Sequence, residues 1–331
     1  MRKNNSYFKR LTEIKGLEYW FVIIWRWLRL RWNDLNKEKK TKNEEEFLKE
    51  YNIGSYERPS VTNDVIIFTT DDKKEENSRK IPKKGLQVLL IKRDDYPEKG
   101  KWAIPGGFIN MDESLEEGSI RKLKDETGID NVYMEQLYSF GEVNRDPRTR
   151  VISVGNVALI SKDNINFSKE KTVKETKWFW IEKNLIAVEN DEKYNFNKYL
   201  LRFKSEDGEM EVSYEVLEKI ERNVLRRKER TYKLLETSTK ELAFDHYKII
   251  DYAIDRIRNK VEYTPIALNL LPRLFTVKEL QCVYEAIMGR EILNFRRKMD
   301  EMIVETDEKI EGKPFRPAKV FKFNEKWEHN F

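Results

Sequence analysis

The chain has 331 residues, of which 39% are hydrophobic and 12% aromatic, so it can bury the cores of two domains and is not globally disordered. Its single cysteine, Cys282, excludes an intramolecular disulfide and every metal site built from several cysteines, which suits the cytoplasm. The net charge of +5 at pH 7 permits a nucleic-acid partner but does not require one.

Residues 1–56 form a basic leader and linker rich in aromatic residues. Between Leu17 and Leu28 apolar residues recur at helical spacing, with arginines in and just after the stripe. We favour a helix that packs against protein, because Trp and Arg are common in interfaces. The alternative is contact of residues 17–32 with an anionic membrane surface. The apolar run Tyr19–Trp25 is far shorter than the roughly 20 residues that span a bilayer.

From Arg58 onward, β-branched and aromatic segments predict a series of strands separated by polar loops. The predicted strands are Val61–Thr70, Leu86–Lys92, Tyr133–Gly141, Val151–Ser161 and Lys177–Ile181. They lie on both sides of one helix, without a regular alternation of strand and helix. This order favours an α+β sandwich with a mixed sheet over a doubly wound parallel sheet.

The most informative stretch runs from Gly107 to Ile129. Five residues separate Gly107 from Glu113, and seven separate Glu113 from Arg121. We expect a helix that begins after Asp112 or Ser114 and ends at Gly128. Acidic or basic side chains at positions 122, 125 and 126 then share one helix face.

This stretch resembles the Nudix box, in which Gly, five residues, Glu and seven residues precede Arg-Glu-apolar-x-Glu-Glu-x-Gly-apolar. The resemblance implies a helix face of carboxylates that holds Mg²⁺ on a diphosphate, with Arg121 orienting a carboxylate. Lys122 and Asp125 depart from the pattern, because the family has Glu at both positions. We therefore expect metal binding by Glu113, Asp125 and Glu126 to be weak or absent, and hydrolysis to be slow or absent.

Residues 191–240 contain a second group of elements. Tyr199–Phe203 and Met210–Leu217 flank Asp207 and Gly208, which predicts a β-hairpin. The basic stretch Lys219–Lys233 is interpreted as the exposed face of a helix, and the alternative is a surface that contacts phosphates.

The last part of the chain predicts helices followed by a strand. A long amphipathic helix covers Ala243–Glu262, and its lone histidine, His246, is expected to be structural. A capping box at Thr276 opens a helix that runs through Met288. A further helix, Phe295–Ile303, follows the cap residue Asn294, and Ala318–Phe323 alternates as a strand. This order is typical of a winged helix, whose second helix enters the major groove of DNA.

A wider set of motifs resembles the Nudix-related transcriptional regulators of NAD and sugar metabolism. The motifs are Glu57–Val61, Lys99–Phe108, Asn144–Arg148, Ala243–His246, Arg258–Pro265, Leu270–Pro272, Phe275–Thr276, Glu279–Gln281, Tyr284–Ala286, Asn294–Lys298, Arg316–Ala318 and Phe321. The resemblance covers residues 56–323 apart from an insertion at about 191–240. It implies a leader over 1–56, a Nudix-type α/β/α sandwich over 57–242, and a linker helix with a winged helix-turn-helix domain over 243–331.

The resemblance also implies a cytoplasmic homodimer that binds ADP-ribose or a related nucleotide. Ligand binding would shift this dimer away from operator DNA or towards it. The expected ligand-binding residues are Gly106, Gly107, Arg121, Glu126, Arg145 and Arg148. The expected DNA-binding residues are Arg296, Arg297, Lys298, Lys313 and Arg316. No cofactor is required, although residual hydrolysis would use Mg²⁺. The alternative function is an active Mg²⁺-dependent ADP-ribose or nucleoside-diphosphate pyrophosphatase whose C-terminal module serves dimerisation.

Overall fold

The computed structural model describes residues 27–28, 44–73, 82–129, 132–162, 175–222, 228–308 and 319–327. The chain divides into two compact units, Met1–Arg58 and Pro59–Phe331. In the first unit, α3 (Glu44–Glu50) has no buried residue and is followed by the short 3-10 helix η1 (Ile53–Ser55). Of the segment 17–32, only Trp27 and Leu28 are described, and both are exposed. No helix in the described part of the chain has the length and apolar character to cross a membrane.

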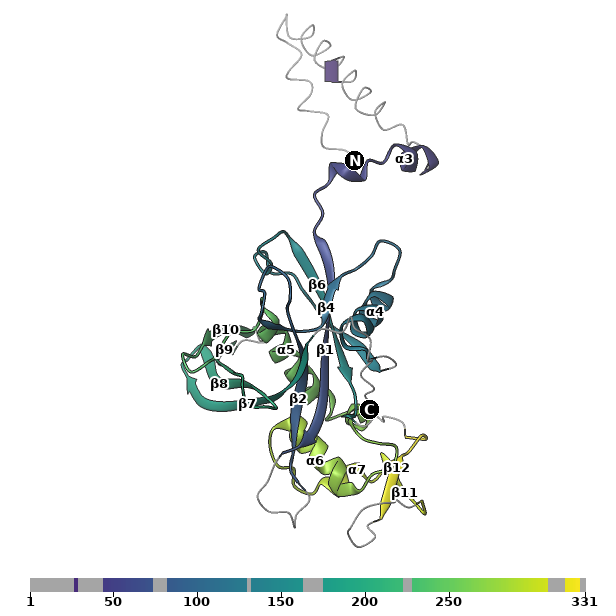
Figure 1. Ribbon diagram of the computed structural model, residues 1–331, viewed down its shortest axis with the longest axis vertical. Helices are drawn as coiled ribbons and strands as arrows, with labels where there is room; N and C mark the ends of the chain where they lie inside the picture. Colours follow the sequence, from purple (N-terminus) through teal and green to yellow (C-terminus); the bar gives the residue numbers. More distant parts are fainter. Residues whose placement is uncertain are drawn as a thin grey trace, which may run out of the picture. The chain divides into compact units, whose positions relative to one another are not determined.

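The second unit is built on a ten-stranded mixed sheet (Figure 1). Its main path has the order β10-β9-β8-β7-β2-β1-β6-β5, while β3 pairs with β2 and β4 pairs with β1. β1 and β6 run parallel, and the other paired strands run antiparallel. The strands are β1 (Ser60–Asp72), β2 (Lys84–Lys92), β3 (Trp102–Ala103), β4 (Gly106–Phe108), β5 (Tyr133–Phe140), β6 (Val151–Leu159), β7 (Thr176–Asn190), β8 (Tyr194–Ser205), β9 (Glu211–Glu221) and β10 (Lys228–Leu234).

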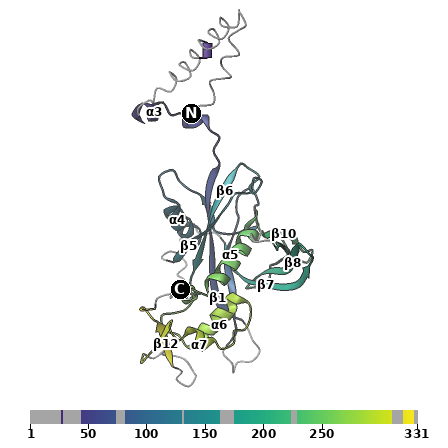
Figure 2. The same ribbon diagram turned by 180° about the vertical axis from the view of Figure 1, so that it is seen from behind.

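Two helices cover opposite faces of this sheet. Successive side chains of β1 alternate between the faces, as the period of a strand requires. Val65 and Ile67 pack in one cluster with Leu123 of α4 (Leu115–Thr127). Ile66 and Phe68 belong to the other cluster, which contains the apolar side of α5 (His246–Lys260) (Figure 2). The expected α/β/α sandwich is therefore confirmed.

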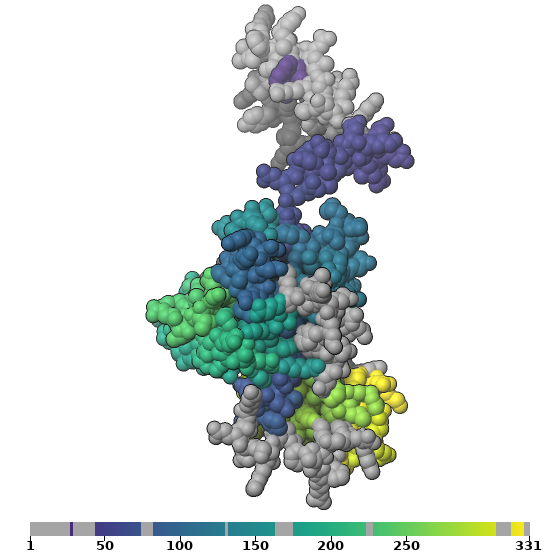
Figure 3. Space-filling view, viewed as in Figure 1, coloured from purple at the N-terminus to yellow at the C-terminus, as the bar shows by residue number. Residues whose placement is uncertain are grey.

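The insertion at 191–240 extends the sheet rather than forming a separate module. β8 and β9 make the expected hairpin, with Gly208 at a φ of 76° in its turn. The described parts of the stretch Lys219–Lys233 are not helical, contrary to the sequence interpretation: they belong to β9, to β10 and to the start of the connection between them. Glu218 and Arg230 lie on the inner face of these strands. The sequence therefore lacks the alternation of apolar and polar residues that would have indicated strands. In Figure 3 the insertion, coloured teal to green, projects at one side of the sheet.

The C-terminal elements form a winged helix that shares its core with the sheet. They are η3 (Pro265–Leu270), α6 (Val277–Met288), α7 (Phe295–Met299), β11 (Ile303–Thr306) and β12 (Val320–Phe323). Thr276 and Glu279 make the expected capping box. The second helix is shorter than predicted, because Ile303 pairs with Phe323 in the β11–β12 hairpin. Asn294 occupies the N-cap position, but its side chain makes no capping hydrogen bond.

Candidate nucleotide site and DNA-binding surface

The Nudix-like stretch forms a strand, a loop and a helix at one end of the sheet. Ser114 begins α4 with a capping box to Glu117, and Gly128 ends it in the left-handed conformation. Gly106 lies so close to β1 that a Cβ atom there would be 2.3 Å from the carbonyl oxygen of Asn63. Only glycine fits this approach, which brings the backbone of β4 directly against β1.

The first acid of the box is held by the box arginine. Arg121 donates from Nε to Oε2 of Glu113 at 2.7 Å and from Nη2 to Oε1. The N–H of Asn110 also donates to Oε1 at 2.7 Å. The Arg121 guanidinium and this N–H lower the pKa of Glu113 to about 2. Glu113 is thus a fixed anion that orders the loop before the helix.

The other two acids are engaged elsewhere. The N–H of Gly106 donates to Oε2 of Glu126 at 2.7 Å. The Asp125 side chain is 58% exposed and lies 3.6 Å from the Arg121 guanidinium. Within the described residues, no three His, Cys, Asp or Glu side chains form a group that could hold a metal ion. With Glu113 held by Arg121, Glu126 bound to Gly106 and Asp125 exposed, the three acids do not present together the octahedral set of oxygens that Mg²⁺ needs.

Lys122 lies where the carboxylate face would otherwise continue. A Cβ atom on Gly107 would be 2.9 Å from Cε and 3.0 Å from Nζ of Lys122. The end of the lysine side chain therefore rests against the main chain of Gly107. Its charge also contributes to the lowered pKa of Glu113, after the larger effects of Arg121 and Asn110.

The two arginines expected to bind ligand have different surroundings. Arg145 donates from Nη2 and Nε to Asp245 at 2.8 and 3.2 Å, and its side chain is only 5% exposed. It also lies 3.7 Å from Asp64, whose pKa is raised by burial. Arg145 is thus held in buried ion pairs, and its contact with a ligand stays a prediction. Sequence reasoning did not identify Asp64 as a partner of Arg145. It did not pair Arg145 with Asp245 either, because 100 positions separate the two residues.

Arg148 remains accessible. It donates to Asp146 at 2.7 Å, its guanidinium lies 5.2 Å from the ring centre of Phe108, and its side chain is 43% exposed. Phe108 directly follows Gly107 and is itself exposed. A guanidinium stacked on an aromatic ring beside the box is a surface suited to a planar or anionic ligand group.

The winged helix presents a small basic surface. Phe295 and Met299 anchor α7 in the core, while Arg296, Arg297 and Lys298 between them are exposed. Lys313 and Arg316 lie outside the described residues. The three cations are exposed on the second helix of the pair, and their contact with phosphates and bases stays a prediction.

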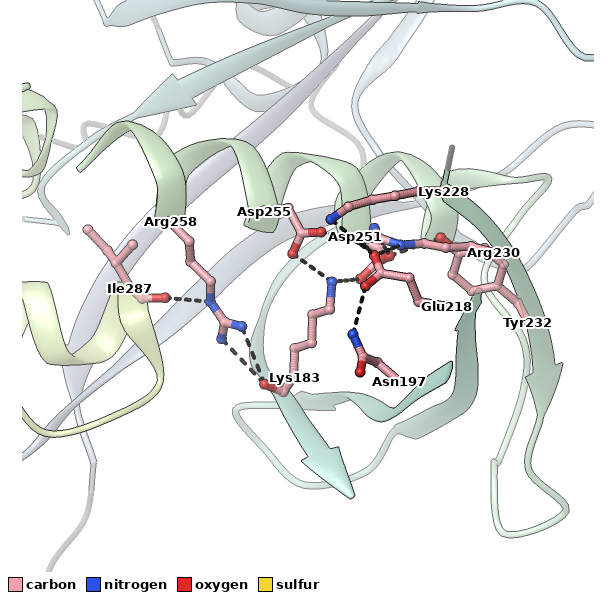
Figure 4. A network of polar contacts seen from close by, with 10 residues as sticks. All are labelled: Lys183, Asn197, Glu218, Lys228, Arg230, Tyr232, Asp251, Asp255, Arg258 and Ile287. Atoms are coloured by element: carbon pink, nitrogen blue, oxygen red, sulfur yellow. Dashed lines mark hydrogen bonds and ion pairs between the residues drawn. The ribbon is translucent and has the colours of Figure 1, made fainter. Parts of the chain in front are cut away.

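A network of ion pairs joins the insertion to α5 (Figure 4). Nζ of Lys183 on β7 lies 2.7 Å from Asp251 and 2.6 Å from Asp255, and the side chains of Lys183 and Asp251 are 2% and 0% exposed. Arg230 on β10 lies 2.7 Å from Asp251 and 2.6 Å from Glu218 on β9. Arg230 therefore has a structural role, although the sequence interpretation placed it on an exposed face.

Two family descriptions match the chain, a NUDIX domain over residues 63–201 and an NrtR DNA-binding winged helix domain over residues 267–323. The ADPR responsive transcriptional repressor NtrR of Acinetobacter baylyi is 32% identical over 288 residues, which is 85% of this chain and 88% of the relative.

Two solved structures are also similar. A MutT/nudix family protein from Enterococcus faecalis is 27% identical, with a TM-score of 0.60 over 88% of this chain and 98% of its own. NrtR from Shewanella oneidensis, complexed with a 27mer DNA, is 25% identical, with a TM-score of 0.50 over 80% and 93% of the two chains.

Proposed function

The chain belongs to the family of Nudix-related regulators with an NrtR winged helix, and from this membership and its two sites we propose that it is a transcriptional repressor that responds to ADP-ribose or a related nucleotide. The observation that carries the proposal is Lys122, a cation at a position where the Nudix box has Glu. A site without a metal-binding set of acids holds its ligand without hydrolysing it, which is what a sensor needs.

The packing supports communication between the two sites. One hydrophobic cluster includes Phe68 and Val88 of the sheet, Ile254 of α5, and Val283 and Ile287 of α6. The sheet and the winged helix are therefore one packed body. A ligand that binds one arrangement of this body better than another shifts the population that binds DNA.

A cytoplasmic homodimer is part of the same proposal. Three exposed cations on a helix of five residues supply few phosphate contacts in one subunit. Two copies double these contacts and match a two-fold symmetric operator. Sedimentation of the full chain is expected to give twice the monomer mass, and a monomer at all concentrations would remove this part of the proposal.

Hydrolysis separates this function from that of a pyrophosphatase. With Mg²⁺, the wild-type chain is expected to leave ADP-ribose intact, as measured by chromatography of ADP-ribose, AMP and ribose 5-phosphate. Lys122→Glu is expected to gain Mg²⁺-dependent cleavage, because it places a carboxylate beside Gly107 on the helix face of Glu126. Wild-type turnover at the rate of the variant would instead establish an enzyme.

A further inference from the structure

We propose that the Lys122 ammonium binds the diphosphate of the nucleotide directly, so that recognition is independent of a divalent metal ion. This inference rests on the proposed function, because it takes a nucleoside diphosphate as the ligand of the box. It assigns to a residue of the chain the charge neutralisation that Nudix boxes obtain from Mg²⁺.

The Lys122 ammonium lies beside the main chain of Gly107. Lys122 projects from α4 across Gly107, and its Nζ lies 3.0 Å from the point where a Cβ atom would stand. It is also close enough to lower the pKa of Glu113, the first acid of the box. The positive charge thus lies at the junction of β4 and α4, where the residues of the box come together.

The charge of Lys122 is available to a ligand. Within the described part of the chain, Lys122 makes no hydrogen bond and no ion pair, although Arg121 beside it is held by Glu113. Lys122 is partly exposed. An ammonium has three donors and no acceptor, and such a point charge suits phosphate oxygens.

The acids of the box do not offer a metal ion a set of oxygens at this place. Glu113 is bound to Arg121, Asp125 is turned outward, and Glu126 accepts from Gly106. A divalent cation beside Gly107 would meet the like charge of Lys122 without a compensating set of oxygens. The Lys122 ammonium and the diphosphate instead attract each other directly, without a bridging metal ion.

The test measures ADP-ribose binding by the full chain with calorimetry, in EDTA and in Mg²⁺, for the wild type, Lys122→Met and Lys124→Met. Methionine keeps the apolar contact with Gly107 and removes the charge. Lys124→Met removes the same charge from an exposed position of the same helix. Thermal unfolding of each variant in the absence of ligand checks the fold.

The wild type is expected to bind equally in EDTA and in Mg²⁺. Lys122→Met is expected to bind roughly 10- to 100-fold more weakly, as the loss of a charged hydrogen bond predicts. Its affinity should also fall less steeply with sodium chloride than that of the wild type. Lys124→Met should behave as the wild type does.

Two results would overturn the inference and leave the proposed function standing. One is ADP-ribose binding by the wild type that requires Mg²⁺. The other is equal affinity and equal salt dependence in Lys122→Met, which would make the lysine a packing residue only. A wild-type chain that binds no ADP-ribose under either condition would remove both the inference and the proposed ligand.

Discussion

Arg258 on α5 donates a hydrogen bond from Nε to the carbonyl oxygen of Ile287, in the last turn of α6, at 2.9 Å. Its Nη1 and Nη2 also approach the carbonyl oxygen of Lys183 on β7 at 3.4 Å. A Cβ atom on Gly289 would lie 2.8 Å from Nη2, so the helix end is shaped around this guanidinium. One side chain thereby joins the sheet, the linker helix and the winged helix.

Arg258→Met is expected to lower the free energy of unfolding by about 1–3 kcal/mol, because it leaves the Ile287 carbonyl without its charged donor. DNA affinity should fall as well, because α6 loses its hydrogen bond to Arg258 of α5. ADP-ribose affinity should stay unchanged. Urea unfolding and calorimetry measure these effects. Arg290→Met is the control, because Arg290 is 65% exposed and lies 3.9 Å from Glu262. Equal effects of the two variants would contradict the role of Arg258.

The buried pair between Lys183 and Asp251 makes the second prediction. Lys183→Met removes the ammonium and leaves Asp251 with Arg230 as its remaining cation. We expect a loss of about 3 kcal/mol in unfolding free energy, the lower end for breaking a buried ion pair.

Lys73→Met serves as the comparison, because the pair of Lys73 with Glu182 is 43% and 37% exposed. Such surface pairs contribute about 0–1 kcal/mol. If Lys183→Met changed the urea midpoint no more than Lys73→Met does, the network would not be a structural element of the fold.

His246 predicts how stability depends on pH. Its Nδ1 accepts from the N–H of Ile104 at 2.9 Å, and burial lowers its pKa to about 3, against an opposing effect of Asp245. The unfolded chain takes up a proton near pH 6.5 and the folded chain does not. The stabilisation is therefore full above about pH 6.5 and falls as pH decreases toward the folded pKa.

We expect His246 to account for a loss of about 2 kcal/mol between neutral pH and pH 5. The measurement compares urea unfolding of the wild type and His246→Gln, which keeps an acceptor but does not titrate. The gap between the two proteins should narrow as the pH decreases. A gap that stays constant from pH 7 to pH 5 would show that His246 is not held neutral by the fold.

Exposed cations on α7 make the fourth prediction. Replacing Arg296, Arg297 and Lys298 by Gln should weaken DNA binding and reduce the slope of log affinity against log salt by about 2 to 3, since each phosphate that is no longer neutralised changes the slope by about 0.9. DNA selected by the wild type from a random-sequence pool provides the probe. The triple replacement of Lys204, Lys233 and Lys240 removes the same charge from the insertion, and it should leave the slope unchanged. Equal slopes in both triple variants would refute a DNA contact by α7.

Local signals in the sequence predicted much of this structure. The box helix has the capping box at Ser114 and the stop at Gly128, and α6 has the capping box at Thr276. These features depend on residues within one or two turns of each other. The strands with alternating apolar residues were found for the same reason.

Long-range pairings decided the features that the sequence did not reveal. Arg230 lies on the inner face of the insertion because it pairs with Glu218 on the neighbouring strand and with Asp251 on α5. Arg145 is buried because Asp245 faces it. The end of α7 depends on the pairing of Ile303 with Phe323. No local pattern in the sequence contains these partners. The sequence therefore predicted a helix where β9 and β10 lie, and a longer second helix in the winged helix.

The most direct test of the account measures fluorescence anisotropy of the selected DNA with the full chain while ADP-ribose is added in EDTA and in Mg²⁺, with the nucleotide analysed by chromatography afterwards. The account predicts that ADP-ribose changes DNA affinity to the same extent under both conditions and is recovered intact. A DNA affinity that does not change when ADP-ribose is added would contradict this prediction. Recovery of the nucleotide as AMP and ribose 5-phosphate would contradict it as well.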